Sequence, residues 1–460
     1  MKSLIIKILF CFIVISLCND LIAQPSDNVK SLSLGRTSVS NTFNLDAFNH
    51  NPANLKESGG RDSSKVYFTL FSSIGYVLNS DFLTINFYNK FFTGDGSGNK
   101  RFLTDADKNE IFNSSKGTSL GFNLNYKLFS ILINTKKAGT FGFALEDKIS
   151  AKSLISSDLA NLTLFGNSIG RTYNVSDFNL NMSWIRQLNF SYANSTNKFI
   201  GQDFSYGISI KPQLGYYYLG VKKNDLSLYT NDSNQLVGNG SLDFLTSDLT
   251  DNGKVTYPLL GNISGFGMGF DVGFNAKINN KFNVGLSVVD IGYITWNKNV
   301  RKYIYSGQFV ITDLSRQEQL DTLRQLINGT KSVDDPFTNG LPTTLRVGMT
   351  YKFFKQFGIA KNESEIARVS FDYIQGLNKK VAGNTTIPII ALGGEFAVTS
   401  FLYPRLGMVI GGDEKYTLSA GIGLVTKNVL IDIGTHNIIT LFKIHESSKI
   451  SGGINIKFRF

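Results

Sequence analysis

Apolar and polar residues alternate along much of the 460-residue chain. In the segment 265–278, GFGMGFDVGFNAKI, every even position is apolar, and the odd positions hold glycine, Asp271, Asn275 or Lys277. Successive side chains of a β-strand point to opposite faces, so this pattern predicts a strand with one apolar and one polar face. A phosphate-binding glycine loop would need glycine at position 270, where the chain has Phe270.

The same alternation recurs in runs that predict further strands. Several of these runs keep the pattern for more than ten residues, whereas strands of soluble proteins average about 5 to 6 residues. A tilted strand needs about 9 to 11 residues to cross a bilayer. The pattern therefore predicts an all-β protein, a transmembrane antiparallel β-barrel of about fourteen strands. The clearest runs are 119–128, 141–146, 178–192, 204–218, 345–353 and 367–373, followed by several between 388 and 460.

Arg186 interrupts the apolar side of the run 178–192, which also carries Trp184. A guanidinium facing lipid at mid-membrane would cost about 2 to 4 kcal/mol. We therefore predict a β-bulge near Arg186 or a position at the membrane interface. In the run 204–218 the same rule places Tyr216 and Tyr218 on the apolar, lipid-facing side.

Long polar segments separate some strands, and short turns such as INNK at 278–281 join others. Outer-membrane barrels have long extracellular loops and short periplasmic turns, which fits this spacing. Within one long segment, Thr104 is followed three residues later by Asp107. This capping-box arrangement predicts a short helix in a loop.

The N-terminus has the features of a cleaved secretory signal at residues 1–23, because two lysines precede an apolar run and Ala23 ends it. A membrane-spanning helix would need about 20 apolar residues, more than this run supplies. A lipoprotein anchor would use Cys18, but Leu17 before it is too large for that cleavage. Cys11 and Cys18 are the only cysteines, so the mature chain would have neither a disulfide nor a thiolate metal site.

The net charge of +11 comes from 46 Lys and Arg against 35 Asp and Glu, without a dense basic block, so no nucleic-acid partner is expected. Only His50, His436 and His445 could serve as a histidine base, and none lies in a catalytic or metal-binding motif. We expect no enzyme activity, no metal and no cofactor. Distant residues could still meet in space, which keeps a membrane-embedded hydrolase as a third alternative.

Residues 34–55 read LGRTSVSNTFNLDAFNHNPANL. This stretch resembles the start of the mature proteins of the FadL-like family of outer-membrane long-chain fatty-acid transporters, although Asn54 stands where the family usually has glycine. Residues 265–296 resemble paired strands of these barrels and of related barrels associated with type IX secretion. The matching positions are Gly35, Asp46, Ala47, Asn51, Pro52, Ala53 and Leu55 in the first stretch, and Asp271, Gly273, Gly285, Ser287, Asp290, Gly292 and Trp296 in the second.

The resemblance implies an N-terminal plug at residues 24–60 inside a barrel at residues 61–460. The turn Asn51, Pro52 and Ala53 would lie in the lumen, where proline stiffens it. Asp271 and Asp290 would lie on neighbouring strands joined by the INNK turn and face the lumen, where a structural salt bridge is the alternative to a functional role. The last residues alternate up to Phe458 and Phe460, which resembles the terminal signal read by the barrel assembly machinery.

We therefore expect a barrel in the cell outer membrane, surrounded by outer-membrane lipids, that passively transports hydrophobic or amphipathic small molecules. The alternative is a non-enzymatic barrel that acts as a scaffold or accessory in protein secretion or surface attachment, with secretion-system proteins as partners. An apolar pocket against the plug and a break in a strand wall would favour transport of a hydrophobic ligand. A lumen filled by side chains would favour the scaffold.

Overall fold

The computed structural model describes most of the chain after the predicted signal peptide. Residues 1–23 and the two ends of the predicted plug lie outside the described residues. The described ranges are 28–56, 65–80, 82–94, 102–135, 137–154, 156–197, 203–247, 263–312, 330–333, 335–357, 362–378, 384–412 and 415–460.

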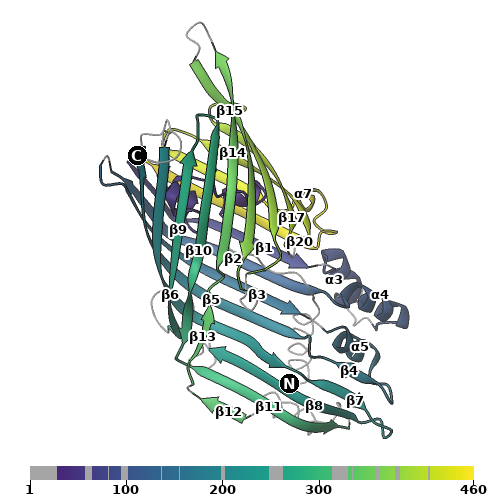
Figure 1. Cartoon of the computed structure of the whole chain (residues 1–460). Coiled ribbons are helices and arrows are strands. Elements are labelled where there is room, and N and C mark those ends of the chain that lie inside the picture. Colours follow the sequence, from purple (N-terminus) through teal and green to yellow (C-terminus); the bar gives the residue numbers. More distant parts are fainter. Residues whose placement is uncertain are drawn as a thin grey trace.

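Fourteen antiparallel strands form a closed ring in which each strand pairs with the next and the last pairs with the first (Figure 1). This confirms the predicted barrel and its strand number. The strands of the ring are β1 (Val66–Ser80), β2 (Ser119–Asn134), β3 (Thr140–Leu154), β5 (Asn179–Thr196), β6 (Asp203–Asn224), β9 (Gly265–Lys277), β10 (Phe282–Trp296), β14 (Thr344–Phe357), β15 (Asn362–Gly376), β16 (Ile389–Phe396), β17 (Leu402–Gly411), β18 (Tyr416–Val425), β19 (Val429–Thr435) and β20 (Lys449–Arg459).

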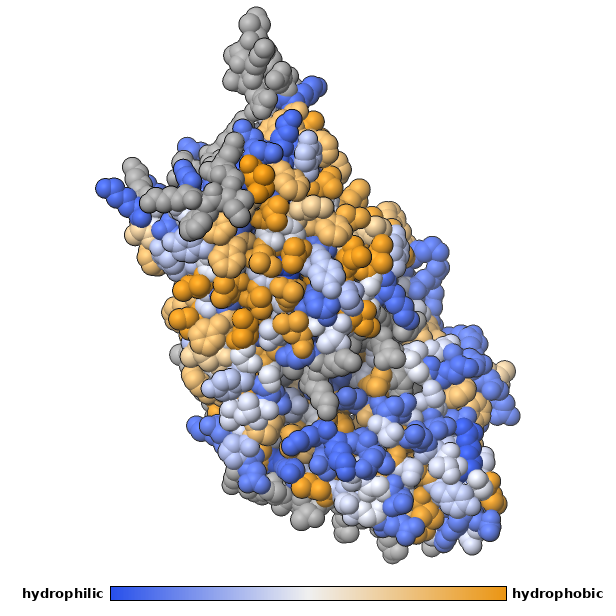
Figure 2. Space-filling view, in the orientation of Figure 1, coloured by the Kyte–Doolittle hydropathy of each residue, from blue (hydrophilic) through white to orange (hydrophobic). Residues whose placement is uncertain are grey.

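The two faces of the barrel wall differ in polarity as the alternation predicts. In β9, Phe266 and Phe270 point outward and are 53% and 45% exposed, whereas Asp271 and Asn275 point inward and are buried. Figure 2 shows apolar side chains gathered over the barrel and mainly polar ones over the part that extends below it. An apolar outer band around a polar interior is the arrangement that a bilayer requires of a β-barrel.

The predicted faces are wrong in part of β5 and β6. The pairing of these strands shifts between Trp184 and Ile185, which confirms the bulge predicted near Arg186. Arg186 points inward and pairs with Asp147 at 2.6 Å. Because a bulge reverses the side that subsequent residues face, Tyr216 and Tyr218 are buried inside and do not face lipid.

Long connections at one end of the ring carry the remaining elements. The capping box predicted at Thr104 is present, and Thr104 accepts a hydrogen bond from the backbone N–H of Asp107 at the start of α4. In the described part of the chain, no helix is both long and apolar enough to cross a membrane. These elements are α3 (Ile85–Phe92), α4 (Asp105–Ser115), α5 (Ser157–Phe165), α7 (Ile439–Phe442), β4 (Thr172–Asn174), β7 (Ser227–Thr230), β8 (Leu236–Ser247), β11 (Val300–Ile311), β12 (Thr330–Val333) and β13 (Phe337–Gly340).

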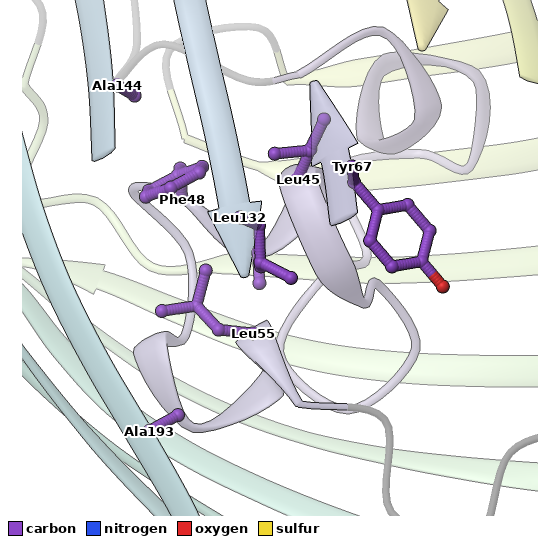
Figure 3. Packing of buried hydrophobic residues seen from close by; sticks show 8 residues of the cluster. Leu45, Phe48, Leu55, Tyr67, Leu132, Ala144 and Ala193 are labelled. Carbon is purple, nitrogen blue, oxygen red and sulfur yellow. The ribbon is translucent and has the colours of Figure 1, made fainter. Parts of the chain in front are cut away.

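Residues 28–56 form a plug inside the barrel, with three short helices: α2 (Val29–Ser33), η1 (Asn44–Ala47) and η2 (Pro52–Leu55) (Figure 1). Nearly all of these residues are buried. On one side, Leu45, Phe48 and Leu55 pack against Tyr67, Leu132, Ala144 and Ala193 of the wall (Figure 3). This apolar cluster joins the plug to β1, β2, β3 and β5.

On the other sides, glycines of the wall make room for the plug. At nine inward-facing glycines of the described strands, a β-carbon would lie closer than 3.0 Å to a plug atom. Contacts this short do not occur in close-packed interiors, so a side chain at these positions would displace the plug. We call these residues the glycine seat: Gly142, Gly207, Gly273, Gly285, Gly393, Gly407, Gly421, Gly434 and Gly453.

The glycine seat predicts that Gly393→Ala destabilises the protein, whereas Gly394→Ala on the same strand does not. A β-carbon at Gly393 would meet the backbone of Leu34, but at Gly394 it would meet only the ring of Phe396 at an ordinary 3.4 Å. Overpacking of this kind typically costs about 1 to 3 kcal/mol. Urea unfolding of the purified variants in lipid would measure the difference. Equal unfolding midpoints would contradict the seat.

Candidate functional site

The turn Asn51, Pro52 and Ala53 lies against β6 and β9 in the lumen. The side chain of Asn51 accepts a hydrogen bond from the backbone N–H of Ala53 at 3.1 Å and so caps η2. Its amide group donates to the backbone oxygens of Val39 and Phe274, both at 2.9 Å. Asn51 therefore joins two parts of the plug to the wall, opposite Gly273 of the glycine seat.

Two acidic groups hold the plug to the wall at separate points. Asp372 of β15, which is fully buried, accepts hydrogen bonds from the backbone N–H groups of Ser38 and Val39 at 2.7 and 2.9 Å. Asp46 of the plug forms an ion pair with Lys457 of β20. Hydrogen bonds to a charged group contribute about 1.5 to 3 kcal/mol each, more than neutral ones.

Asp271 and Asp290 lie together in the lumen, as part of a cluster centred on Lys211 of β6. The Lys211 ammonium is 2.7 Å from a carboxylate oxygen of each aspartate, and all three residues are buried. The backbone N–H of Asp290 also donates to Asp271 at 2.8 Å. Lys148 of β3 approaches Asp290 to 3.8 Å. Because breaking a buried ion pair leaves an uncompensated charge, each member of this cluster holds the others in place.

Sequence reasoning did not single out Lys211 or Asp372. Both occupy the polar, glycine-bearing side of a predicted strand, where Lys211 follows Gly207 and Asp372 follows Ser370. A charged residue on that side must face the lumen. This signal identifies the face of each residue but not its partners, which lie on β9 and β10 for Lys211 and in the plug for Asp372.

The barrel wall is irregular at Asp290. The ladder between β10 and β14 ends at Val289 and Thr344, and β10 resumes pairing only at Tyr293, with β13. Asp290 has a φ of 55°, in the left-handed region, and the β9–β10 pairing also shifts here. We call residues 290–292 and 341–343 the wall bulge. Two hydrogen bonds cross it, from Thr343 Oγ1 to the oxygen of Asp290 at 2.9 Å and from the Leu341 N–H to the oxygen of Gly292 at 3.0 Å.

An aromatic cluster packs beside the wall bulge. Trp296 is fully buried, and its ring lies 5.5 Å from that of Tyr218 and 6.4 Å from that of Phe337. Leu341 of the wall bulge belongs to the same cluster. The cluster therefore places apolar surface at the only stretch of the described β10–β14 ladder where the strand pairing lapses.

The short-turn end of the barrel contains a cavity of about 920 Å³. The plug forms its floor with Lys30 and residues 43–46, and strands from β9 round to β20 form its sides. Arg405 lies in this lining and pairs with Glu395 and Asp432, both at 2.6 Å. We call this polar cavity the vestibule. It is not the apolar pocket against the plug that would favour transport of a hydrophobic ligand.

The three histidines lie apart. His50, in the plug, faces two donors, the backbone N–H of Asn28 and the guanidinium of Arg346, both at 3.2 Å. His436 accepts a hydrogen bond from Arg36 at 3.3 Å, and His445 lies in the connection after α7. In the ranges that the structure describes, no group of His, Cys, Asp and Glu could hold a metal ion.

Phe458 and Phe460 lie where the barrel closes. Their rings stack on that of Phe68 of β1, with centroids 5.1 and 5.9 Å apart. The backbone N–H of Phe460 donates to the oxygen of Val66 at 2.9 Å. The final residues thus pair with the first strand of the ring. Their recognition by the assembly machinery stays a prediction.

Fourteen antiparallel strands, an apolar outer face and a polar lumen that holds an N-terminal plug define the fold of a transmembrane β-barrel. The chain belongs to the family described as Family of unknown function (DUF5723), whose model matches residues 59–432. No curated protein matches the sequence.

Solved barrel structures are similar to the chain over nearly its full length at low identity. The toluene transporter TbuX of Ralstonia pickettii is 12% identical, with 93% of this chain and 96% of that chain covered and a TM-score of 0.41. The deltaS2S3 mutant of the monoaromatic hydrocarbon channel TodX, a Pseudomonas putida protein, is 11% identical, with coverages of 96% and 99% and a TM-score of 0.49. A FadL homologue of Pseudomonas aeruginosa is 12% identical, with coverages of 95% and 97% and a TM-score of 0.39.

Removal of the Asp372 carboxylate is expected to loosen the plug without opening the barrel. The Asp372→Ala variant would leave the N–H groups of Ser38 and Val39 without their acceptor, at a cost of about 2 to 3 kcal/mol. Hydrogen exchange measured by mass spectrometry should become faster in the plug and stay unchanged in β9. Asp105→Ala, at an exposed position of α4, is the control. Unchanged plug exchange would contradict the anchoring role.

Because His50 is buried in the plug, we predict that the protein loses stability in acid. Burial, and next the nearby Arg346, hold the pKa of His50 well below its ordinary value of 6.5. Below about pH 6.5 the unfolded chain therefore binds a proton that the folded chain excludes, and stability falls by up to about 1.4 kcal/mol per pH unit. His50→Gln should unfold with a shallower pH dependence between pH 6.5 and 5 than the wild type. Parallel curves for the two proteins would exclude this role for His50.

Proposed function

We propose that this protein is an outer-membrane channel that passes hydrophobic or amphipathic small molecules sideways through its wall. The long connections face the outside of the cell and the short turns face the periplasm, as in other outer-membrane barrels. The barrel assembly machinery would insert it through the terminal signal that contains Phe458 and Phe460. The observation that carries the proposal is the wall bulge beside an apolar cluster.

The lumen itself offers a hydrophobic molecule no continuous path. The plug fills it between the glycine seat and the apolar cluster of Figure 3, and buried ion pairs cross the remaining space. An apolar molecule that entered this space would have to displace charged groups from their partners, at a large cost. At the wall bulge, in contrast, the aromatic cluster that includes Leu341 lies beside a stretch of wall that two hydrogen bonds cross.

The test is entry of the hydrophobic dye N-phenyl-1-naphthylamine into intact cells that carry the barrel. This dye fluoresces in hydrocarbon and is excluded by an intact outer membrane. We expect faster entry with the wild-type barrel than without it, and severalfold faster entry with Leu341→Ala, because the truncation opens the inner side of the wall bulge. Leu132→Ala, which makes the same truncation in the apolar cluster under the plug, is the matched control. Entry at the barrel-free rate for the wild type would overturn transport.

A disulfide that locks the plug would distinguish passage through the wall bulge from passage through the lumen. The side-chain oxygens of Ser40 and Thr350 lie 2.7 Å apart, so cysteines at both positions are close enough to bond. Both natural cysteines precede residue 19, which leaves the engineered pair alone in the mature chain. Dye entry through the wall bulge should be equal in the oxidised and reduced forms. Entry that stops on oxidation would instead place the route through the lumen.

A scaffold in secretion or surface attachment is the second candidate, because the filled lumen favours it. The pairing of β6 with β8 and of β8 with β11 carries the wall beyond the apolar band as a polar sheet. A partner that binds this sheet would be cross-linked to β8 or β11 in whole cells. Cross-linking to the same protein together with absent dye entry would support the scaffold over the channel.

A further inference from the structure

The vestibule at the short-turn end has an unequal charge balance. Its lining contains eight basic side chains and four carboxylates, an excess of four positive charges. The basic residues are Lys30, Lys277, Lys352, Arg368, Arg405, Lys427, Lys457 and Arg459, and the acidic ones are Asp46, Glu365, Glu395 and Asp432.

Every carboxylate of the lining is already paired with a cation of the lining. Glu395 lies 2.6 Å from Arg405 and 3.5 Å from both Lys30 and Arg368. Asp432 lies 2.6 Å from both Arg405 and Lys457, whose ammonium also reaches Asp46. Glu365 pairs with Arg368 at 2.7 Å. The floor is thus a compensated network, and the positive excess lies elsewhere.

Two of the excess positive charges lie at the mouth. Lys277, at the end of β9, and Lys427, in the turn between β18 and β19, pair with no carboxylate among the described residues. Six strands of the ring, from β10 to β18, separate the two lysines. A single phosphate or carboxylate could not reach both ammonium groups. Charges spread around a cavity of about 920 Å³ fit a ligand that carries several negative charges along a chain.

The walls of the vestibule also extend beyond the barrel. The hairpin of β14 and β15 supplies Lys352, Phe354 and Glu365 to the lining, and it projects past the neighbouring strands (Figure 1). The lining is mainly charged and polar, unlike the apolar pockets that hold small hydrophobic molecules. A hydrophobic cargo therefore gains little here, whereas a polar chain could contact both the cavity and the hairpin.

We propose that the vestibule docks an acidic peptide segment of a periplasmic protein. Complementary charge steers such a segment to the mouth and fixes its position there. The lysines at the mouth supply the attraction, and the compensated floor, which the plug completes, closes the cavity behind the peptide. Docking at the vestibule does not require passage of molecules through the wall bulge, so it can be tested whether or not the barrel transports.

The test measures binding of a fluorescein-labelled oligoglutamate peptide to the full-length barrel in lipid nanodiscs by fluorescence anisotropy. Lys277→Glu with Lys427→Glu reverses both charges at the mouth. Lys108→Glu with Lys443→Glu makes the same net change at the opposite end, on the half-buried Lys108 and the exposed Lys443. We expect the first pair to weaken binding about tenfold or more and the second pair to leave it nearly unchanged, because contacts at the site decide the dissociation rate.

Four outcomes decide the proposal. Tight binding of oligoglutamate by the wild type, with none of oligoglutamine and with the loss confined to the mouth variant, would support it. Equal weakening by both variants would overturn it, because the overall charge would then be the cause. Displacement of the peptide by equimolar inorganic phosphate would also overturn it, in favour of a site for small anions. No binding by the folded wild type would overturn it outright.

Discussion

The close contact between the plug and the glycine seat is the constraint on which the other features depend. Nine strands bring a glycine to within a β-carbon's reach of the plug, so the wall and the plug fit only in one relative position. That position places the N–H groups of Ser38 and Val39 against Asp372 and places Asp46 against Lys457. These hydrogen bonds and this ion pair hold the plug, but the glycines of the seat, which have no side chain, determine where it can lie.

The charged groups of the lumen are arranged in two layers with different tasks. One layer, around Lys211, Asp271 and Asp290, lies beside the wall bulge and fixes a backbone conformation that aspartate adopts rarely. The other layer, around Arg405, forms the floor of the vestibule and includes the plug residues Lys30 and Asp46. Both layers neutralise charge inside a membrane protein, where unpaired charge is costly. At the mouth of the vestibule, Lys277 and Lys427 have no carboxylate partner among the described residues.

Much of the fold could be predicted from the sequence, because side chains alternate along a strand. Whether a residue stands at an odd or an even position therefore decides whether it faces lipid or the lumen. The strands, their number, the helix after Thr104 and the bulge near Arg186 follow from such local patterns. Periodicity places Tyr216 and Tyr218 on the wrong face of the strand. Aromatic residues suit both faces, and periodicity alone does not locate the residue at which a bulge exchanges the inward and outward sides. The partners of Lys211 lie on the nearby strands β9 and β10, and those of Asp372 lie in the plug. Which residues meet there depends on strand register and on the position of the plug, and not on any local segment. The vestibule likewise forms only when segments from residue 30 to residue 460 come together in the closed barrel.

The plug also sets a requirement on the order of assembly. It precedes every strand in the chain, yet its seat includes glycines from β3 to β20, and its ion pair with Lys457 lies on the last strand. The contacts that hold the first 29 described residues thus join distant parts of the sequence, and such contacts form slowly. The plug can make its contacts with Lys457 and with the glycines of β16 to β20 only once these last strands are in place. The final position of the plug therefore depends on the part of the chain that is made last.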